Sequence, residues 1–104
     1  MTQMTIHEDD KYVKIDIVGH AGYNPGNDVV CAAISTMTYA LINSLERLMD
    51  GFMINDLVVV DDPGNFHIEF TKMYKFRRRW YDIRDFFMIG MEMISEQYPE
   101  YLQI

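Results

Sequence analysis

The chain has 104 residues, of which 49% are hydrophobic and 24% charged, a balance typical of one folded domain over residues 1–104 rather than of a disordered segment. Nine basic and sixteen acidic residues leave a formal net charge of −7, which disfavours nucleic acid and anionic membranes as partners. A single cysteine cannot form an internal disulfide, and neither a secretory signal pattern nor an apolar run of roughly eighteen residues is found. We therefore expect a soluble, cytoplasmic protein.

The first predicted elements are two short strands and a loop. A strand over Met4 to His7 would pair with a second strand from Tyr12 to Val18, in which apolar and polar residues alternate with the period of a half-buried strand. From Gly19 to Asn27, glycine, proline and asparagine gather. This segment is predicted to be a loop, because neither a helix nor a strand would tolerate its composition.

A helix and a further pair of strands follow. Apolar residues recur at steps of three and four, the spacing of a helix with one buried side, with Asn27 or Asp28 as N-cap and Gly51 as stop. Two strands, Leu57 to Val60 and Phe66 to Phe70, are then joined by a cluster of turn-forming residues. The buried side of the helix would consist of Val30, Ile34, Met37, Leu41, Leu45 and Leu48.

A second amphipathic helix is predicted from about Lys75 to Gln97. Tyr98-Pro99 would end it, since proline disfavours helix in the residue before it, and Glu100 to Ile104 could add a short strand. The element order predicts a small α+β domain with a mostly antiparallel sheet covered by two helices. The apolar side of this helix would consist of Trp80, Ile83, Phe87, Met91 and Ile94.

Cys31 is the residue with the clearest chemical potential. It falls in the first turn of the first predicted helix, three residues after Asp28, where free N–H groups and the helix dipole stabilise a thiolate. His20 lies eleven positions earlier and could take the thiol proton and later protonate a leaving amine. A lone cysteine is more often a small buried residue, so the spacing alone leaves both interpretations open.

The segments Gly19-His20-Ala21, Gly26 and Asp28-Val29-Val30-Cys31-Ala32-Ala33-Ile34-Ser35 resemble the signature of the ribosomal-processing cysteine proteases, the Prp family. The segments Gly90-Met91-Glu92 and Tyr98-Pro99-Glu100-Tyr101 also resemble the end of that family. The resemblance implies an α+β homodimer that removes an N-terminal extension from a large-subunit ribosomal protein in bacteria such as Firmicutes, cutting after paired aromatic residues. It further implies that His20 and Cys31 are the catalytic dyad.

The resemblance also implies that the loop between the dyad residues moves when substrate binds. Gly19, Gly22 and Gly26 would give this loop its freedom of movement.

The roles of the other motif residues stay open. Asp28 would cap the helix and could also orient His20 as the third member of a triad. The Ser35 hydroxyl could contact substrate or, as we slightly prefer, bond back to the carbonyl of Val30 or Cys31. The N–H groups from Val30 to Ala32 are the expected oxyanion donors.

We expect no metal or other cofactor. The three histidines and the cysteine share no recognised ligand spacing. These residues are His7, His20, His67 and Cys31.

Six of the nine basic residues crowd into one region that we do not recognise as part of the family pattern. They would form a solvated helix face whose positive charge is balanced by Asp82 and Asp85. The alternative is a surface that binds an acidic region of the substrate or a second subunit. The cluster is compatible with a divergent member carried by a phage or mobile element, whose target would be a virion protein. The six residues are Lys72, Lys75, Arg77, Arg78, Arg79 and Arg84.

Two functions from other classes remain as alternatives. The chain could be a non-catalytic dimeric binding module that holds a ribosomal or viral partner. A redox sensor ranks last, because the chain has no second cysteine to resolve a sulfenic acid.

Overall fold

The computed structural model describes residues 1–104 and begins with a hairpin of β1 (Thr2–Glu8) and β2 (Tyr12–Val18). Alternate residues of β2, namely Val13, Ile15 and Ile17, are buried, whereas Lys14 between them is exposed. The turn is held by the Asp9 carboxylate, which accepts hydrogen bonds from the next backbone N–H groups. The predicted alternation is therefore confirmed, and β1 is longer than expected at both ends.

Helix α1 (Val29–Asp50) begins after its N-cap Asp28 and ends at Gly51, as predicted. The expected apolar residues are buried except for Met37, which is half-buried, and Thr38 and Ile42 are buried beside them. By length and composition alone α1 would pass for a membrane-spanning helix, although no uninterrupted apolar run has that length. Its buried side packs on the sheet, as in the core helix of a two-layer fold.

Strands β3 (Ile54–Asp62) and β4 (Asn65–Lys72) form the second hairpin and extend beyond the predicted limits. The register shifts between Asn55 and Val58, and Asp56 has a φ of 56°. These features mark a β-bulge, which leaves part of a strand unpaired and twists it locally. Polar residues at the ends of β3 pair with β4 although their sequence does not favour a strand.

The last elements are a single 3₁₀ turn (Tyr74–Phe76), helix α2 (Arg77–Gln97) and the short strand β5 (Leu102–Gln103). Trp80, Phe87 and Met91 of α2 are buried, and the Trp80 ring packs edge-on against Phe70 of β4 at 4.8 Å between centroids. The predicted second helix is thus confirmed, with a tighter first turn.

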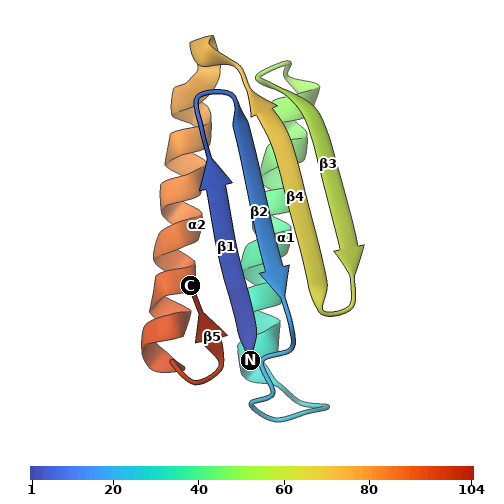
Figure 1. Cartoon of the computed structure of the whole chain (residues 1–104), viewed down its shortest axis with the longest axis vertical. Helices are drawn as coiled ribbons and strands as arrows, with labels where there is room; N and C mark the ends of the chain where they lie inside the picture. Colours follow the sequence, from blue (N-terminus) through green and yellow to red (C-terminus); the bar gives the residue numbers. More distant parts are fainter.

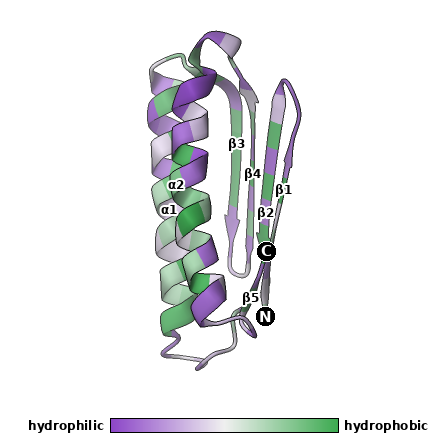
Figure 2. Ribbon diagram, turned by 90° about the vertical axis from the view of Figure 1, so that its left-hand side faces the viewer, coloured by the Kyte–Doolittle hydropathy of each residue, from purple (hydrophilic) through white to green (hydrophobic).

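The sheet has the order β3-β4-β2-β1-β5, and every pairing is antiparallel except that of β1 with β5. Figure 2 shows two layers, with both helices on one face of the sheet. The loop between β2 and α1, the β3–β4 turn, β5 and the end of α2 lie at the lower end of the molecule in Figure 1. The fold therefore brings the parts of the sequence motif to one end and leaves the start of α2 at the other.

Candidate active site

Asp28 fastens the start of α1 to the loop that precedes it. Its Oδ1 accepts a hydrogen bond from the N–H of Cys31 at 2.9 Å, and its Oδ2 accepts bonds from the N–H groups of Tyr23 at 2.9 Å and Asn24 at 3.4 Å. The Cys31 N–H bond, followed by those from the loop, lowers the pKa of Asp28 against a smaller opposing effect of burial. Asp28 is therefore a charged N-cap, and the structure contains no hydrogen bond from it to His20.

Cys31 is half-buried in the first turn of α1 and packs against the core. Ser35 and Tyr39 follow on the same flank, since residues four apart are neighbours on a helix. The Tyr39 hydroxyl donates to Asp61 of β3 at 2.9 Å, and its ring packs edge-on against Phe66 of β4. The flank that carries Cys31 therefore faces β3 and β4 and not α2.

The predicted oxyanion donors are occupied. The Cys31 N–H donates to the Asp28 carboxylate at 2.9 Å, and the Ala32 N–H donates to the Asp28 carbonyl at 3.0 Å. The Val30 N–H also contributes to the lowered pKa of Asp28. The N–H groups of Cys31 and Ala32 are therefore not free in this conformation, because the carboxylate and the carbonyl of Asp28 accept them.

Ser35 makes no hydrogen bond to the carbonyl of Val30 or Cys31, so that prediction is wrong. Neighbouring hydroxyls do make such bonds: Thr36 donates to the carbonyl of Ala32, and Thr38 donates to that of Ile34. The Ser35 hydroxyl, half-buried on the Cys31 flank, stays available for another partner.

His20 is exposed in the loop directly after β2, and its ring lies against the β3–β4 turn. A Cβ placed on Gly64 would come within 2.6 Å of the His20 Nε2 atom. No hydrogen bond joins His20 to Cys31. The structure thus brings Asp28, Cys31 and Ser35 together on α1 and places His20 on the neighbouring turn.

The loop that joins His20 to Cys31 is anchored by aromatic contacts that the sequence analysis missed. The ring of Tyr23 packs edge-on against Tyr98 at 5.4 Å and Tyr101 at 5.1 Å between centroids. Gly22 and Gly26 on either side of Tyr23 have φ values of 75° and 90°, which favour glycine. The signal in the sequence was the Tyr98-Pro99-Glu100-Tyr101 motif, whose two tyrosines both contact this loop.

Two of the clustered basic residues serve the interior of the fold. Lys72 and Arg84 form ion pairs with Glu8 at 2.9 and 3.2 Å, and the Trp80 indole donates to the same carboxylate at 3.2 Å. Burial raises the pKa of Glu8, but these hydrogen bonds outweigh burial and leave the pKa lowered. Arg84 also forms an ion pair with Asp85 at 3.2 Å. The prediction that neighbouring carboxylates balance the basic charges is therefore confirmed for Asp85 only.

The remaining basic residues lie around the start of α2, at the end of the molecule away from Cys31 (Figure 1). Arg77 stacks on the ring of Tyr74 at 3.9 Å, and Lys75, Arg78 and Arg79 are exposed. No group of three His, Cys, Asp or Glu side chains is arranged to hold a metal ion.

Comparisons with known proteins show the family and the fold of the chain. The model of a family described as cysteine protease Prp matches residues 1–103. The ribosomal processing protease Prp of S. aureus, solved with a covalently linked product peptide, shares 25% identity at a TM-score of 0.75, covering 99% of this chain and 96% of that one. SMU.848 from Streptococcus mutans shares 26% identity at a TM-score of 0.64, covering 99% and 90%.

A second structure of the S. aureus protease, with a substrate peptide, shares the fold at 22% identity and a TM-score of 0.70, covering 99% and 96%. No curated protein sequence matches the chain. The family match over nearly the whole sequence identifies the chain as a member of the Prp family of cysteine proteases.

Proposed function

We propose that Cys31 is the nucleophile of this peptidase and that His20 is its general base. The observation that carries the proposal is that a member of a cysteine protease family has a single cysteine, at the N-terminal turn of α1. The dipole of a helix N-terminus favours a thiolate there, although Asp28 accepts a hydrogen bond from the N–H of Cys31 in this structure. Asp28, which carries a negative charge beside it, opposes the thiolate, so a nearby imidazolium is needed to offset that charge.

The reaction follows from these roles. His20 takes the proton from the Cys31 thiol, and the sulfur attacks the scissile carbonyl, so that a carbon–sulfur bond forms and the carbonyl oxygen becomes an oxyanion. His20 then gives its proton to the leaving amine, the peptide bond breaks, and a thioester remains on Cys31. Water, deprotonated by the same imidazole, hydrolyses the thioester and restores the thiol.

This sequence of steps requires the loop between residues 19 and 28 to move. In the structure His20 lies on the β3–β4 turn, and the Asp28 carboxylate occupies the N–H of Cys31. Movement of the rest of this loop would open the space between the imidazole and the thiol and, if Asp28 is displaced, release backbone donors for the oxyanion. Conformational steps of this kind assemble many active sites only when substrate binds.

For the substrate, we propose an N-terminal extension that ends in paired aromatic residues, on a large-subunit ribosomal protein or on a phage virion protein with the same motif. The related S. aureus enzyme is a ribosomal processing protease. Tyr39 and Phe66 form an aromatic surface on the Cys31 flank of α1, and such a surface suits aromatic side chains of a substrate. We propose that the enzyme acts in the cytoplasm, where a lone thiol stays reduced.

The dyad is tested by cleavage of a peptide that spans the aromatic motif. Cys31→Ala and His20→Ala should each abolish cleavage, while Ser44→Ala, which removes a hydroxyl from the middle of α1, should cleave at the wild-type rate. Mass spectrometry of the host ribosomal protein and of a candidate virion protein after incubation identifies the new N-terminus. Full cleavage by Cys31→Ala would overturn the proposed chemistry.

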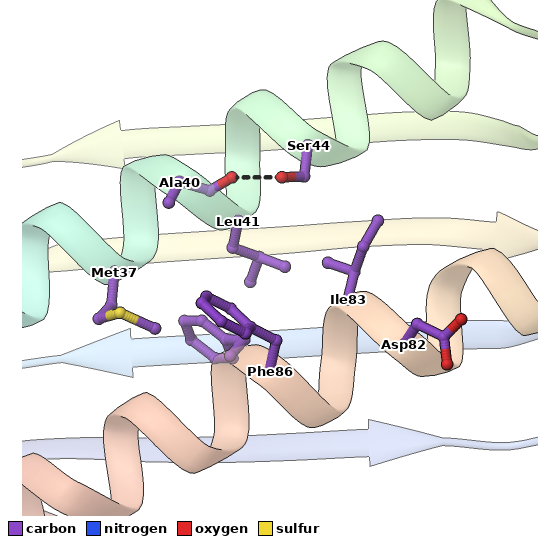
Figure 3. A pocket seen from close by; sticks show the side chains of 8 residues that line it. Met37, Ala40, Leu41, Ser44, Asp82, Ile83 and Phe86 are labelled. Atoms are coloured by element: carbon purple, nitrogen blue, oxygen red, sulfur yellow. Dashed lines mark hydrogen bonds between the residues drawn. The ribbon is translucent and has the colours of Figure 1, made fainter.

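We also propose that the enzyme is a homodimer formed through α2. On the outer side of this helix Phe86 is 73% exposed and Ile89 and Met93 are each 57% exposed. A groove of about 600 Å³ runs between them and the first turns of α1. It continues into a hollow of about 260 Å³, where Figure 3 shows Met37 and Leu41 of α1 beside Phe86. Such an apolar patch on a surface marks an interaction site.

The charges of α2 favour a second copy as the partner. Arginines stand at its start and glutamates near its end, the reverse of what a helix dipole favours, and its first turn has no acidic residue and its last turn no basic one. Two residue lines with a seven-residue period run along the exposed side, as in a coiled-coil seam. One line is Arg79, Phe86 and Met93, and the other is Asp82, Ile89 and Glu96.

Two copies of α2 could pair antiparallel about a two-fold axis that passes at the level between Phe87 and Met88. This pairing would cover the exposed apolar residues and match the charges at the two ends of the helix. Phe86 would face Ile89 of the second copy, and Arg79 would face Glu96 of the second copy, so that opposite charges meet at both ends of the seam. A two-fold interface is self-complementary in this way by necessity.

Charge reversal tests this pairing. Arg79→Glu and Glu96→Arg should each weaken the dimer in light scattering at low salt, and the double variant should restore it because the opposite charges meet again. Lys75→Glu, an exposed change outside the seam, serves as control. Three variants that are all as dimeric as the wild type would exclude α2 as the interface.

A further inference from the structure

The backbone conformation of the β3–β4 turn only partly explains why glycine stands at position 64. Pro63 and Gly64 are the two central residues of the turn, and Gly64 has a φ of 74°. A type II turn requires a positive φ at its second central position, which glycine adopts most readily and asparagine also tolerates. The turn alone therefore favours glycine at position 64 and still admits asparagine.

The space beside Gly64 distinguishes the two. A Cβ added to Gly64 would lie 2.6 Å from Nε2, 3.0 Å from Cε1 and 3.3 Å from Cδ2 of His20, whereas carbon atoms in good contact are about 3.5 to 4.0 Å apart. The imidazole of His20 thus occupies the volume that any side chain at position 64 would need. Only glycine allows the ring to lie there.

A backbone hydrogen bond holds the two segments in register. The N–H of Gly19, directly before His20, donates to the carbonyl of Gly64 at 2.8 Å. This bond continues the ladder in which Val18 of β2 pairs with Asn65 of β4. No hydrogen bond holds the His20 ring itself, so packing on the turn backbone sets where the ring lies.

We propose that Gly64 is a positioning residue for His20, because its bare Cα leaves a seat for the imidazole at the end of the sheet. In the proposed reaction the imidazole keeps this seat while the rest of the loop, residues 21–27, moves and opens the space between the ring and Cys31. The inference rests on the proposed function, in which His20 is the general base. Because His20 is exposed, a side chain at position 64 would push the ring outward into solvent without unfolding the protein.

Two substitutions separate loss of the seat from strain in the turn. Gly64→Ala introduces both a Cβ and an unfavourable left-handed residue, whereas Gly64→Asn introduces the Cβ in a residue that tolerates this backbone. Both should lower kcat for peptide cleavage by about 100-fold with little change in KM, since a misplacement of about 1 Å has an effect of that size. Pro63→Ala changes the same turn without a Cβ at position 64 and should keep kcat near the wild-type value.

A nuclear magnetic resonance measurement tests the seat without using activity. The wild-type protein should show nuclear Overhauser effects between the ring protons of His20 and the α-protons of Gly64, and Gly64→Asn should lose the corresponding contact. Absence of this contact in the wild type would overturn the proposal, as would wild-type kcat in both position-64 variants.

The two ideas fail in different ways. If His20→Ala cleaves normally but the ring contact is present, the proposed general base is wrong and the seat exists without a catalytic purpose. If His20→Ala is inactive and Gly64→Asn is fully active, the base is right and Gly64 does not position it.

Discussion

Replacing Tyr23 by alanine should loosen the loop that joins His20 to Cys31. The tyrosine ring makes two edge-on contacts, with Tyr98 and Tyr101, and each such pair contributes about 0.5 to 1.5 kcal/mol. Because Tyr23 is 45% exposed, we take the lower half of that range, so the two contacts together stabilise the docked loop by about 1 to 2 kcal/mol. Their loss should raise the population of undocked loop by about 5- to 30-fold.

Amide hydrogen exchange measures this opening directly. The Asn24 N–H donates to the Asp28 carboxylate in the docked loop, so its exchange rate reports the undocked fraction. Tyr23→Ala should speed its exchange about 5- to 30-fold, and Tyr23→Phe should leave it nearly unchanged because the ring remains. Tyr74→Ala removes an exposed tyrosine at the other end of the molecule and controls for general effects of ring loss.

The reasoning would be refuted by an unchanged Asn24 exchange rate in Tyr23→Ala. It would also be refuted if Tyr23→Phe exchanged as fast as Tyr23→Ala, because the hydroxyl rather than the ring would then hold the loop.

Three further substitutions test the interior, the exposed sheet face and the core. Glu8→Ala leaves Lys72, Arg84 and the Trp80 indole without their shared acceptor. It should lower the free energy of unfolding, measured in urea, by about 2 kcal/mol. Glu46→Ala, on the exposed side of α1, should change that free energy little, and equal effects of the two variants would contradict the stabilising role of the Glu8 contacts. The hydrogen bonds from His67 to Asp16 and then Glu69 raise the pKa of His67 above 6.5. The stability that these bonds add is therefore complete below the pKa of His67 in the unfolded state, and it is lost as the pH rises through the pKa in the folded state. The thermal midpoint should therefore decrease as the pH rises from about 6 to about 8. His67→Gln should remove the part of this decrease that His67 causes, whereas His7→Gln should retain it. If the midpoint of His67→Gln decreases as steeply as that of the wild type, the hydrogen bonds of His67 are not the cause. Leu45 is fully buried in α1, so Leu45→Ala should lower the free energy of unfolding by about 3 kcal/mol, and a loss below that of the exposed variant Glu46→Ala would contradict the packing described.

The local elements were predictable because each depends on neighbouring residues. The alternation of Val13, Ile15 and Ile17 and the N-cap Asp28 were read directly from the sequence. The bulge at Asp56 was missed, since three aspartates and an asparagine near the ends of β3 favour a turn, and pairing with β4 overrides that preference.

Contacts between distant segments were not predictable. Glu8 lies 64 positions before Lys72 and 76 before Arg84, and no spacing rule links residues so far apart. The place of His20 on Gly64 depends on β4 lying next to β2, which follows from the sheet order and not from spacing. The occupied N–H groups at Cys31 and Ala32 have a local cause, because the aspartate predicted to cap the helix bonds the same groups that were predicted as oxyanion donors.

The parallel pairing of β5 with β1 has a practical consequence for handling the protein. It brings both chain ends toward the end of the molecule that holds the loop between His20 and Cys31 (Figure 1). The carbonyl of Met1 lies so near Gly19 that a Cβ there would contact it. An affinity tag fused at the N-terminus would therefore emerge beside this loop, and cleavage assays should use protein from which such a tag has been removed.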